Sequence, residues 1–264
     1  HTHNEAANKE VIFRLKRTAV QNSQGANLHN GWASVTNRRN GSPFYEVSRA
    51  LYNKLAATPG DIRLATTVFT TGTTTTSSLI DPNYTTSADV KNTDILVLHK
   101  HGGQSALTSA NGFNPDFMVC RLSEMYLSRA EAMARLAVKN SDANSLTSSL
   151  VDINLIRKSR DTASATKAFT ASILAVPPTG AIKATALLDS IIVERRKEFA
   201  LEGHRIFDLN RTKTDYVKIN AAGNSASRLI QYTATTSSYY YRTILPIPVT
   251  QVQNNPKMVQ NPGF

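Results

Sequence analysis

Apolar residues recur at helical spacing between residues 117 and 213 of the chain. The pattern first predicts a helix over residues 121–139, then a short turn and a second helix over residues 146–157. The apolar face of the first helix is expected to contain Leu122, Met125, Tyr126, Ala130, Met133 and Ala137. Two such helices form an antiparallel hairpin of the tetratricopeptide type, and one hairpin must pack on further helices to bury its apolar face.

A third helical pattern, from Leu187 to Lys213, carries the densest charge in the chain. Its apolar stripe comprises Leu187, Leu188, Ile191 and Ile192, with Phe199 further on. Gly203 allows a break before a shorter helix over His204–Arg211. The charged residues of the stretch include Glu194, Glu198, Glu202, Arg195, Arg196, Arg205 and Arg211.

These three glutamates are compatible with an acid–base site and with a structural network of ion pairs. A glycoside hydrolase needs two carboxylates that face each other across a substrate, whereas carboxylates on successive turns of one helix point the same way. We therefore favour the structural interpretation, in which the charges hold the long helix to the shorter one and to the tail. Replacing Glu198 or Arg205 by alanine should then destabilise the protein.

The part before residue 117 is rich in loops. Alternating side chains predict a strand over residues 9–17, and Ser42 with Pro43 predicts the start of a helix that contains Val47, Leu51 and Leu55. A threonine-rich stretch over residues 66–78 favours a surface hairpin or a loop. A short apolar run over residues 95–99 predicts a buried strand.

The glycine- and asparagine-rich loop before Ser42 contains the only tryptophan, Trp32. This residue is compatible with a plug at the edge of the core and with a platform that stacks on the apolar face of a sugar. Candidate companions in ligand binding are Asn30, Arg38 and Tyr45. No catalytic residue is predicted.

Metal and cofactor sites lack support in the sequence. His99 and His101 have no further ligands nearby, so we predict no metal site and no cofactor. The single cysteine, Cys120, excludes a disulfide within the chain, and we expect a buried, unreactive thiol at the start of a helix.

The last part, residues 214–264, is predicted to form an extended tail. Residues 239–245 read as a strand, and the four prolines beyond them, Pro246, Pro248, Pro256 and Pro262, argue against a helix. The apolar residues expected to hold this tail on the surface are Leu245, Ile247, Val252 and Met258.

The composition is that of a globular protein, with 264 residues of which 41% are hydrophobic. We expect a single mainly α-helical domain with irregular loops and short β-hairpins, in three parts: 1–116, 117–213 and 214–264. The formal charge of +11 favours anionic partners. The basic residues are scattered and form no recognisable module, which argues against nucleic-acid binding.

Several motifs together resemble the carboxy-terminal region of the SusD/RagB outer-membrane proteins of Bacteroidetes. In chain order these motifs are KEVIF at 9–13, RLSEMYLSRAEAMARLA at 121–137, DINLIRKSRD at 152–161, ERRKEFALEGHRIFDLNRT at 194–212, LPIP at 245–248 and NPKMVQNPGF at 255–264. The resemblance implies a mainly helical, SusD-like fold in which tetratricopeptide-type helix pairs support ligand sites built from loops.

The resemblance also implies a function. Members of this family are lipid-anchored nutrient-binding subunits on the extracellular face of the outer membrane, where they cover a TonB-dependent transporter. Their ligands are glycans or, for some members, peptides, and they catalyse no reaction. The family's ligand residues are not carried over to this chain, and the run from Glu194 to Arg211 is a signature of the scaffold.

The chain departs from the family pattern in one respect. The amino-terminal region, with its lipid-anchoring cysteine and earlier helices, is not in the sequence, so we expect a fragment or a processed form. The remaining helices should then expose apolar faces that the missing region or another chain would cover.

Overall fold

The computed structural model describes residues 9–16, 47–68, 96, 100, 117–161, 180–218, 227–230 and 245–261. The chain falls into two compact units. The first unit consists of residues His1–Ile80 and Thr93–Glu202, and the second of Asp81–Asn92 and Gly203–Phe264. The division into one domain of three parts stays a prediction.

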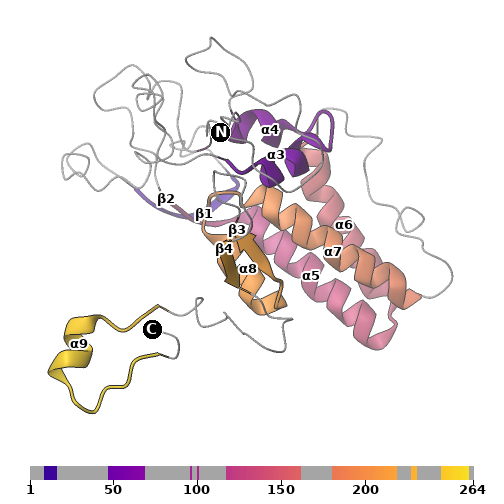
Figure 1. The fold of residues 1–264 in the computed structure, drawn as a ribbon. Coiled ribbons are helices and arrows are strands. Elements are labelled where there is room, and N and C mark those ends of the chain that lie inside the picture. Colours follow the sequence, from indigo (N-terminus) through magenta and orange to yellow (C-terminus); the bar gives the residue numbers. More distant parts are fainter. Residues whose placement is uncertain are drawn as a thin grey trace, which may run out of the picture. The chain divides into compact units, whose positions relative to one another are not determined.

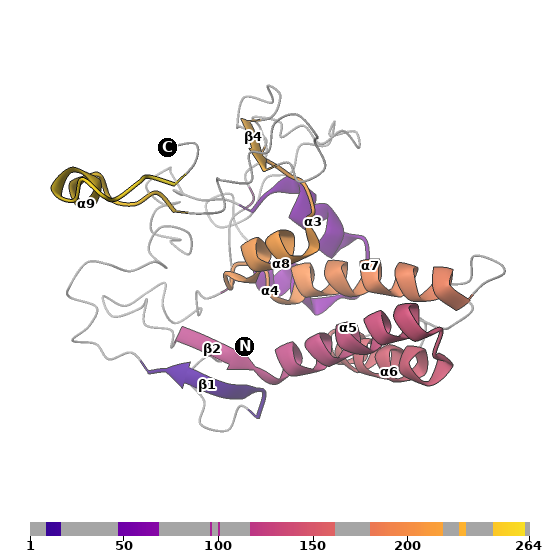
Figure 2. The same cartoon turned by 90° about the horizontal axis from the view of Figure 1, so that it is seen from below.

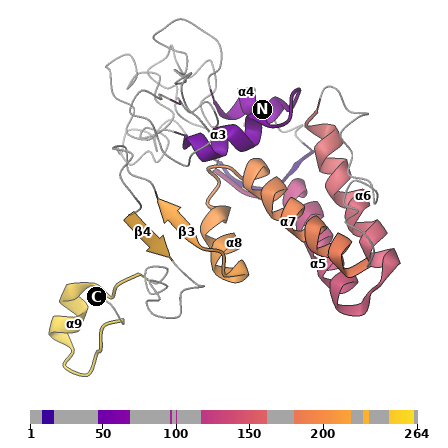
Figure 3. The same ribbon diagram turned by 45° about the vertical axis from the view of Figure 1, so that its right-hand side comes forward.

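A bundle of three helices forms the main body of the first unit (Figures 1 and 3). Helix α5 spans Leu122–Asn140, α6 spans Ala143–Ser159 and α7 spans Gly180–Glu198. The predicted helical hairpin is confirmed: Ser141 ends α5 in the left-handed conformation, and the Asp142 carboxylate caps α6 by accepting from the amides of Asn144 and Ser145. Helix α7 covers one side of this hairpin, as one helix pair alone requires.

The core of the bundle is built from aliphatic residues, small residues and one phenylalanine. It consists of Leu127, Ala130, Ala134, Ile153, Ile156, Leu187, Ile191 and Phe199. Ala130 and Ala134 are small, and both are fully buried, so they allow α5 to pack closely on its neighbours. The predicted apolar face of α5 is wrong at Leu122 and Met125, which are exposed, because the buried stripe runs through Leu127 instead.

An antiparallel two-stranded ribbon leads into α5 (Figure 2). Strand β1 (Val11–Leu15) lies within the predicted strand and pairs with β2 (Phe117–Arg121), so that Val11 faces Arg121 and Leu15 faces Phe117. The Glu10 carbonyl accepts from the Leu122 amide at 2.8 Å, which ties the start of the ribbon to the first turn of α5.

Two short helices follow β1 in the first unit. Helix α3 spans Arg49–Ala56 with Ser48 as its N-cap, and α4 spans Ile62–Thr67 with Asp61 as its N-cap. Residues 47 and 48 are not helical, so the predicted start at Ser42–Pro43 is wrong, and α4 was not predicted. Val47, Leu51, Leu55, Val68, Leu96 and Ala200 form a second apolar cluster.

The longer segment of the second unit begins at Gly203, which has a positive φ of 85° and so confirms the predicted break. Helix α8 spans His204–Thr212, as predicted, and strands β3 (Tyr216–Lys218) and β4 (Ser227–Ile230) pair antiparallel. None of the helices in the described part of the chain has the length and apolarity needed to cross a membrane.

The tail contains a helix that the sequence argument excluded. Helix α9 spans Val249–Asn254, and it fits between two prolines because Pro248 is its N-cap and needs no amide donor there. The Gln260 side chain pairs with both backbone groups of Ile247 at 2.8 Å and closes the segment on itself. Of the predicted surface anchors, Leu245 is instead exposed.

Candidate functional site

The strongest concentration of charge lies at the carboxyl end of α7. Glu194 and Glu198 are buried on its last two turns, and Glu202 lies in the turn that follows. In the described part of the chain, six cations approach these three carboxylates within ion-pair distance: Arg63, Lys100, Arg121, Arg157, Arg160 and Lys197. We call these nine residues, with Glu10 and Asp61, the α7 ion cluster.

Glu198 is the centre of this cluster, because three arginines from different elements donate to its carboxylate. Arg160, just after α6, donates at 2.8 and 3.2 Å. Arg63 of α4 donates at 3.2 Å and Arg121 of β2 at 3.0 Å. Glu198 therefore connects four elements of the first unit that lie far apart in the sequence.

The surroundings of Glu198 keep its carboxyl group ionised. Burial alone would raise its pKa, but the hydrogen bonds and charge of Arg160, with the charges of Arg121 and Arg63, outweigh this effect. The pKa is therefore far below the ordinary glutamate value. A carboxyl group held so firmly as the anion is a poor proton donor at neutral pH.

The end of α7 is capped by cations. The Glu198 carbonyl accepts from Lys100 Nζ at 2.9 Å and from Arg121 Nη2 at 3.2 Å, which suits the negative end of the helix dipole. Arg121 also binds Glu202 through two parallel hydrogen bonds of 2.9 and 3.0 Å. Burial lowers the pKa of Lys100, although Glu202 opposes that shift.

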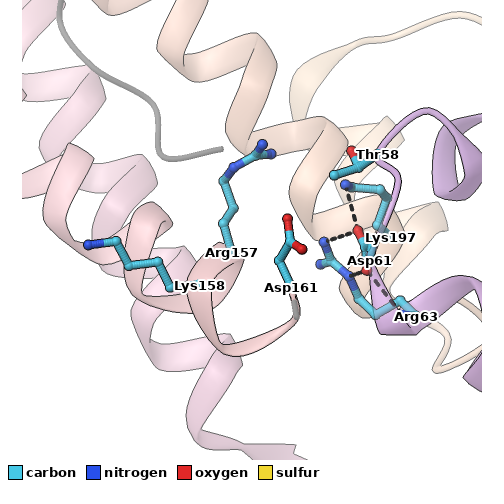
Figure 4. Close-up of a pocket in the computed structure, with 7 residues that line it drawn as sticks. All are labelled: Thr58, Asp61, Arg63, Arg157, Lys158, Asp161 and Lys197. Atoms are coloured by element: carbon cyan, nitrogen blue, oxygen red, sulfur yellow. Dashed lines mark hydrogen bonds and ion pairs between the residues drawn. The ribbon is translucent and has the colours of Figure 1, made fainter. Parts of the chain in front are cut away.

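A small pocket borders the cluster, lined by Thr58, Asp61, Arg63, Arg157, Lys158, Asp161 and Lys197 (Figure 4). Asp61 lies between two cations: Arg63 donates to it at 2.7 and 2.9 Å, and Lys197 at 3.1 Å. Burial would raise the pKa of Asp61, but the hydrogen bonds and charges of Arg63 and the charge of Lys197 lower it. Asp61, Arg63 and Lys197 are thus engaged with one another at the edge of this pocket.

The geometry supports a structural role for the cluster. Its six cations face five carboxylates, so most of the charge is compensated inside the protein. Glu194 and Glu198 are nearly inaccessible and are held by two or more cations each. Neither presents a carboxylate to a substrate, which argues against the hydrolase interpretation of Glu194, Glu198 and Glu202.

Sequence analysis did not identify most of the cations that pair with Glu194, Glu198 and Glu202. It proposed Arg195, Arg196, Arg205 and Arg211, but Arg211 pairs with Asp208, and Arg195 donates to Ser128 and lies over the Phe199 ring. The cations found instead come mainly from α4, β2 and the end of α6. The one local signal for Arg63 and Arg160 is that each lies near an aspartate at a helix end, Asp61 and Asp161.

The residues predicted to bind ligand, Trp32, Asn30, Arg38 and Tyr45, lie outside the described residues, as do His99 and His101. In the part of the chain that the structure describes, no group of three or more His, Cys, Asp or Glu residues is arranged to hold a metal ion. The Trp32 site therefore stays a prediction.

Cys120 differs from its prediction in position. It lies in β2 and not in a helix, and its side chain is half-buried. Desolvation raises the pKa of the thiol, and Glu124 raises it further. The thiol is therefore protonated at neutral pH, in line with the predicted lack of reactivity.

Comparison with solved structures places the fold. A SusD superfamily protein of Bacteroides fragilis matches with a TM-score of 0.55 and 22% identity over 100% of this chain and 53% of its own. A SusD-like carbohydrate binding protein of Bacteroides vulgatus matches with a TM-score of 0.51 and 19% identity, over 81% of this chain and 38% of its own. Surface glycan-binding protein A of Bacteroides uniformis matches with a TM-score of 0.54 and 16% identity, over 96% of this chain and 48% of its own.

The chain thus spans about half or less of the length of these three proteins. No curated protein matches the sequence. The sequence model of the SusD family matches residues 9–264, which is almost the whole chain. This match includes the motifs at both ends of the chain and the glutamates of the α7 ion cluster. The chain therefore belongs to the SusD family.

Proposed function

We propose that the chain belongs to a glycan-binding subunit that delivers its ligand to a TonB-dependent transporter of the outer membrane. The observation that carries this proposal is the family match over residues 9–264. Two structural relatives support it, since one is described as a carbohydrate binding protein and another as a surface glycan-binding protein. Binding without catalysis agrees with the engagement of the α7 glutamates in ion pairs.

The ligand site is proposed at the loop around Trp32, with Asn30, Arg38 and Tyr45. An indole face stacks on the apolar side of a sugar ring, while amide and guanidinium groups hydrogen-bond its hydroxyls. The α7 ion cluster is not part of this site, because its charges are buried and satisfied by one another. A peptide ligand is the alternative within the same class of protein.

A binding screen tests the proposal. Isothermal titration of the 264-residue chain with a panel of neutral and acidic glycans and with peptides should give glycan binding that Trp32→Ala weakens. Phe207→Ala is the matched control, because Phe207 is an exposed aromatic outside this loop (70% exposed) and should bind as the wild type does. Binding of peptides alone would contradict the glycan proposal, and unchanged binding by Trp32→Ala would contradict the site.

The proposed location is the extracellular face of the outer membrane, with a lipid anchor on a segment outside this sequence. The three structural relatives named above come from Bacteroides species, and this supports the proposed location. Protease treatment of intact cells should degrade the protein, whereas a periplasmic protein in the same cells should survive. Copurification of the protein with an outer-membrane transporter tests the proposed partner.

The proposal includes a polypeptide segment that covers the exposed apolar side chains of α6 and β1 in the first unit. Val151 and Leu155, one turn apart on α6, are 62% and 46% exposed, and Phe13 of β1 is 53% exposed. Exposed apolar faces of this kind mark interaction surfaces. The cover would be a preceding region of a longer polypeptide or another chain. A clean monomer in solution that binds no dye specific for apolar surfaces would contradict this part of the proposal.

A further inference from the structure

In the described part of the first unit, cationic side chains are more often exposed than carboxylates are. In its described residues, the side chains that are both exposed and cationic are Lys9, Lys16, Arg129, Arg135, Lys139 and Lys158. Asp189 is the one exposed carboxylate in that same part of the chain. The other carboxylates there are buried or half-buried, and Glu194, Glu198 and Asp61 belong to the α7 ion cluster. Among the described residues of the first unit, the exposed charged side chains are therefore mainly basic.

Two ion pairs on the α5–α6 hairpin show this difference in exposure between cations and carboxylates. Arg129 Nε lies 2.7 Å from Asp152 Oδ2, with side chains 60% and 4% exposed. Arg135 Nη2 lies 2.7 Å from Glu131 Oε1, with side chains 54% and 7% exposed. In each pair the arginine donates from Nε and Nη2 to a carboxylate that lies beneath it. The negative charge is therefore covered, and the donors left for a ligand are those on the outer edge of the guanidinium group, at Nη1 and the second N–H of Nη2.

The same surface offers more than charge. The Arg129 guanidinium lies 5.4 Å from the centre of the Tyr126 ring, and Leu136 is exposed on α5 between Arg129 and Lys139 along the helix. Guanidinium groups bind carboxylate and sulfate groups in a planar, two-point geometry. Apolar side chains beside them suit the nonpolar face of a sugar ring.

We propose that the glycan captured by this protein is acidic, a polysaccharide that carries carboxylate or sulfate groups. This inference rests on the proposed function and names its ligand class. The exposed cations lie on either side of β1 and on α5 and α6, so they do not form one continuous run along the sequence. Nucleic acid has a denser charge and favours a continuous basic stripe or a dedicated module.

The test compares four polymers in isothermal titrations with the 264-residue chain. The polymers are polygalacturonate, chondroitin sulfate, neutral dextran and double-stranded DNA. We expect the two acidic glycans to bind at least about tenfold more tightly than dextran, because the surface potential attracts anions. Their affinity should fall as salt rises from about 50 mM to about 200 mM.

Two double variants test whether the binding of acidic glycans depends on the exposed cations. Lys139→Glu with Lys158→Glu should weaken the binding of acidic glycans at least about fivefold at low salt. Lys139→Arg with Lys158→Arg is the matched control and should bind as the wild type does. Both lysines are exposed, so both variants should fold, and a denaturant unfolding curve of each verifies this.

Each result decides between the proposals. Binding of neutral glycan as tightly as acidic glycan would overturn this inference and leave the proposed function standing. Failure to bind any glycan, including those of the wider screen, would overturn both. DNA binding as tight as that of the acidic glycans would overturn the inference by showing an unselective basic surface, and unchanged binding by the double glutamate variant would overturn it as well.

Discussion

Helix α7 passes through two kinds of interior. Its middle turns place Leu187 and Ile191, both inaccessible, in the apolar core against α5 and α6. Its last turns place Glu194 and Glu198, equally buried, among arginines and lysines. The same helix therefore contributes apolar packing at one point and a network of buried charges at another.

The two regions differ in how directional their interactions are. Apolar burial is strong but nondirectional, so it holds α5, α6 and α7 together without selecting one detailed arrangement. A buried carboxylate must be matched by donors at defined angles, since an unpaired charge is very costly. We infer that the α7 ion cluster decides where α4, β2 and the end of α6 meet α7.

The largest effect should come from Glu198→Ala. Three arginines would lose their shared carboxylate in a buried site, which should lower the free energy of unfolding by about 3–5 kcal/mol. Denaturant titration followed by circular dichroism measures this change. The control is Arg135→Ala, an exposed i,i+4 partner, expected to cost about 0.3–0.5 kcal/mol. Equal costs for the two variants would contradict the central place of Glu198.

The apolar interior should respond to Ile191→Ala. Ile191 is fully buried, and its truncation should cost about 2–5 kcal/mol through lost burial and a cavity. Val193→Ala on the same helix is the control, because Val193 is partly exposed and should cost much less. We also expect Ile191→Ala to leave the acid sensitivity of the protein unchanged, which would separate the apolar core from the α7 ion cluster.

Acid should weaken the charged interior selectively. Because the folded-state pKa of Glu198 is depressed, its contribution to stability is complete above the ordinary glutamate pKa of about 4.3 and is lost as the pH falls below that value. Glu198→Gln should therefore flatten the loss of stability below about pH 4. The free energy of unfolding measured at several pH values checks this, and equal slopes for wild type and variant would refute it.

A smaller effect is expected just beyond the cluster, at Gly203. A Cβ there would meet no atom within 4 Å, so Gly203→Ala should cost only the backbone strain of the positive φ, about 1 kcal/mol. Gly203→Asn should cost less, because asparagine tolerates this conformation better. A loss as large as that of Glu198→Ala would show that the turn after α7 is more tightly packed than the structure indicates.

Local patterns predicted the bundle well. The periodicity of the apolar residues located α5, α6 and α7, and Gly203 marked the break before α8. Periodicity could not decide which of two apolar stripes on α5 is buried, because Leu122 and Met125 are as apolar as the residues that pack. Short helices such as α4 and α9 carry too few turns to produce a pattern.

The charged interior could not be predicted from local patterns. Arg63 and Glu198 are 135 positions apart, so nothing in the sequence around either residue indicates the other. The prediction used only charges within reach on the same stretch, and it therefore named Arg195 and Arg211. Its conclusion that the stretch is structural rested on helical geometry, and the burial of Glu194 and Glu198 supports it.

The central claim is that the α7 ion cluster is a scaffold and that ligand binding occurs elsewhere. The most direct test measures glycan affinity and unfolding free energy together for Glu202→Gln, which removes the charge that Arg121 and Lys100 share. The account predicts a destabilised protein with wild-type affinity. Wild-type stability with lost glycan binding would contradict it and would make the cluster a ligand site.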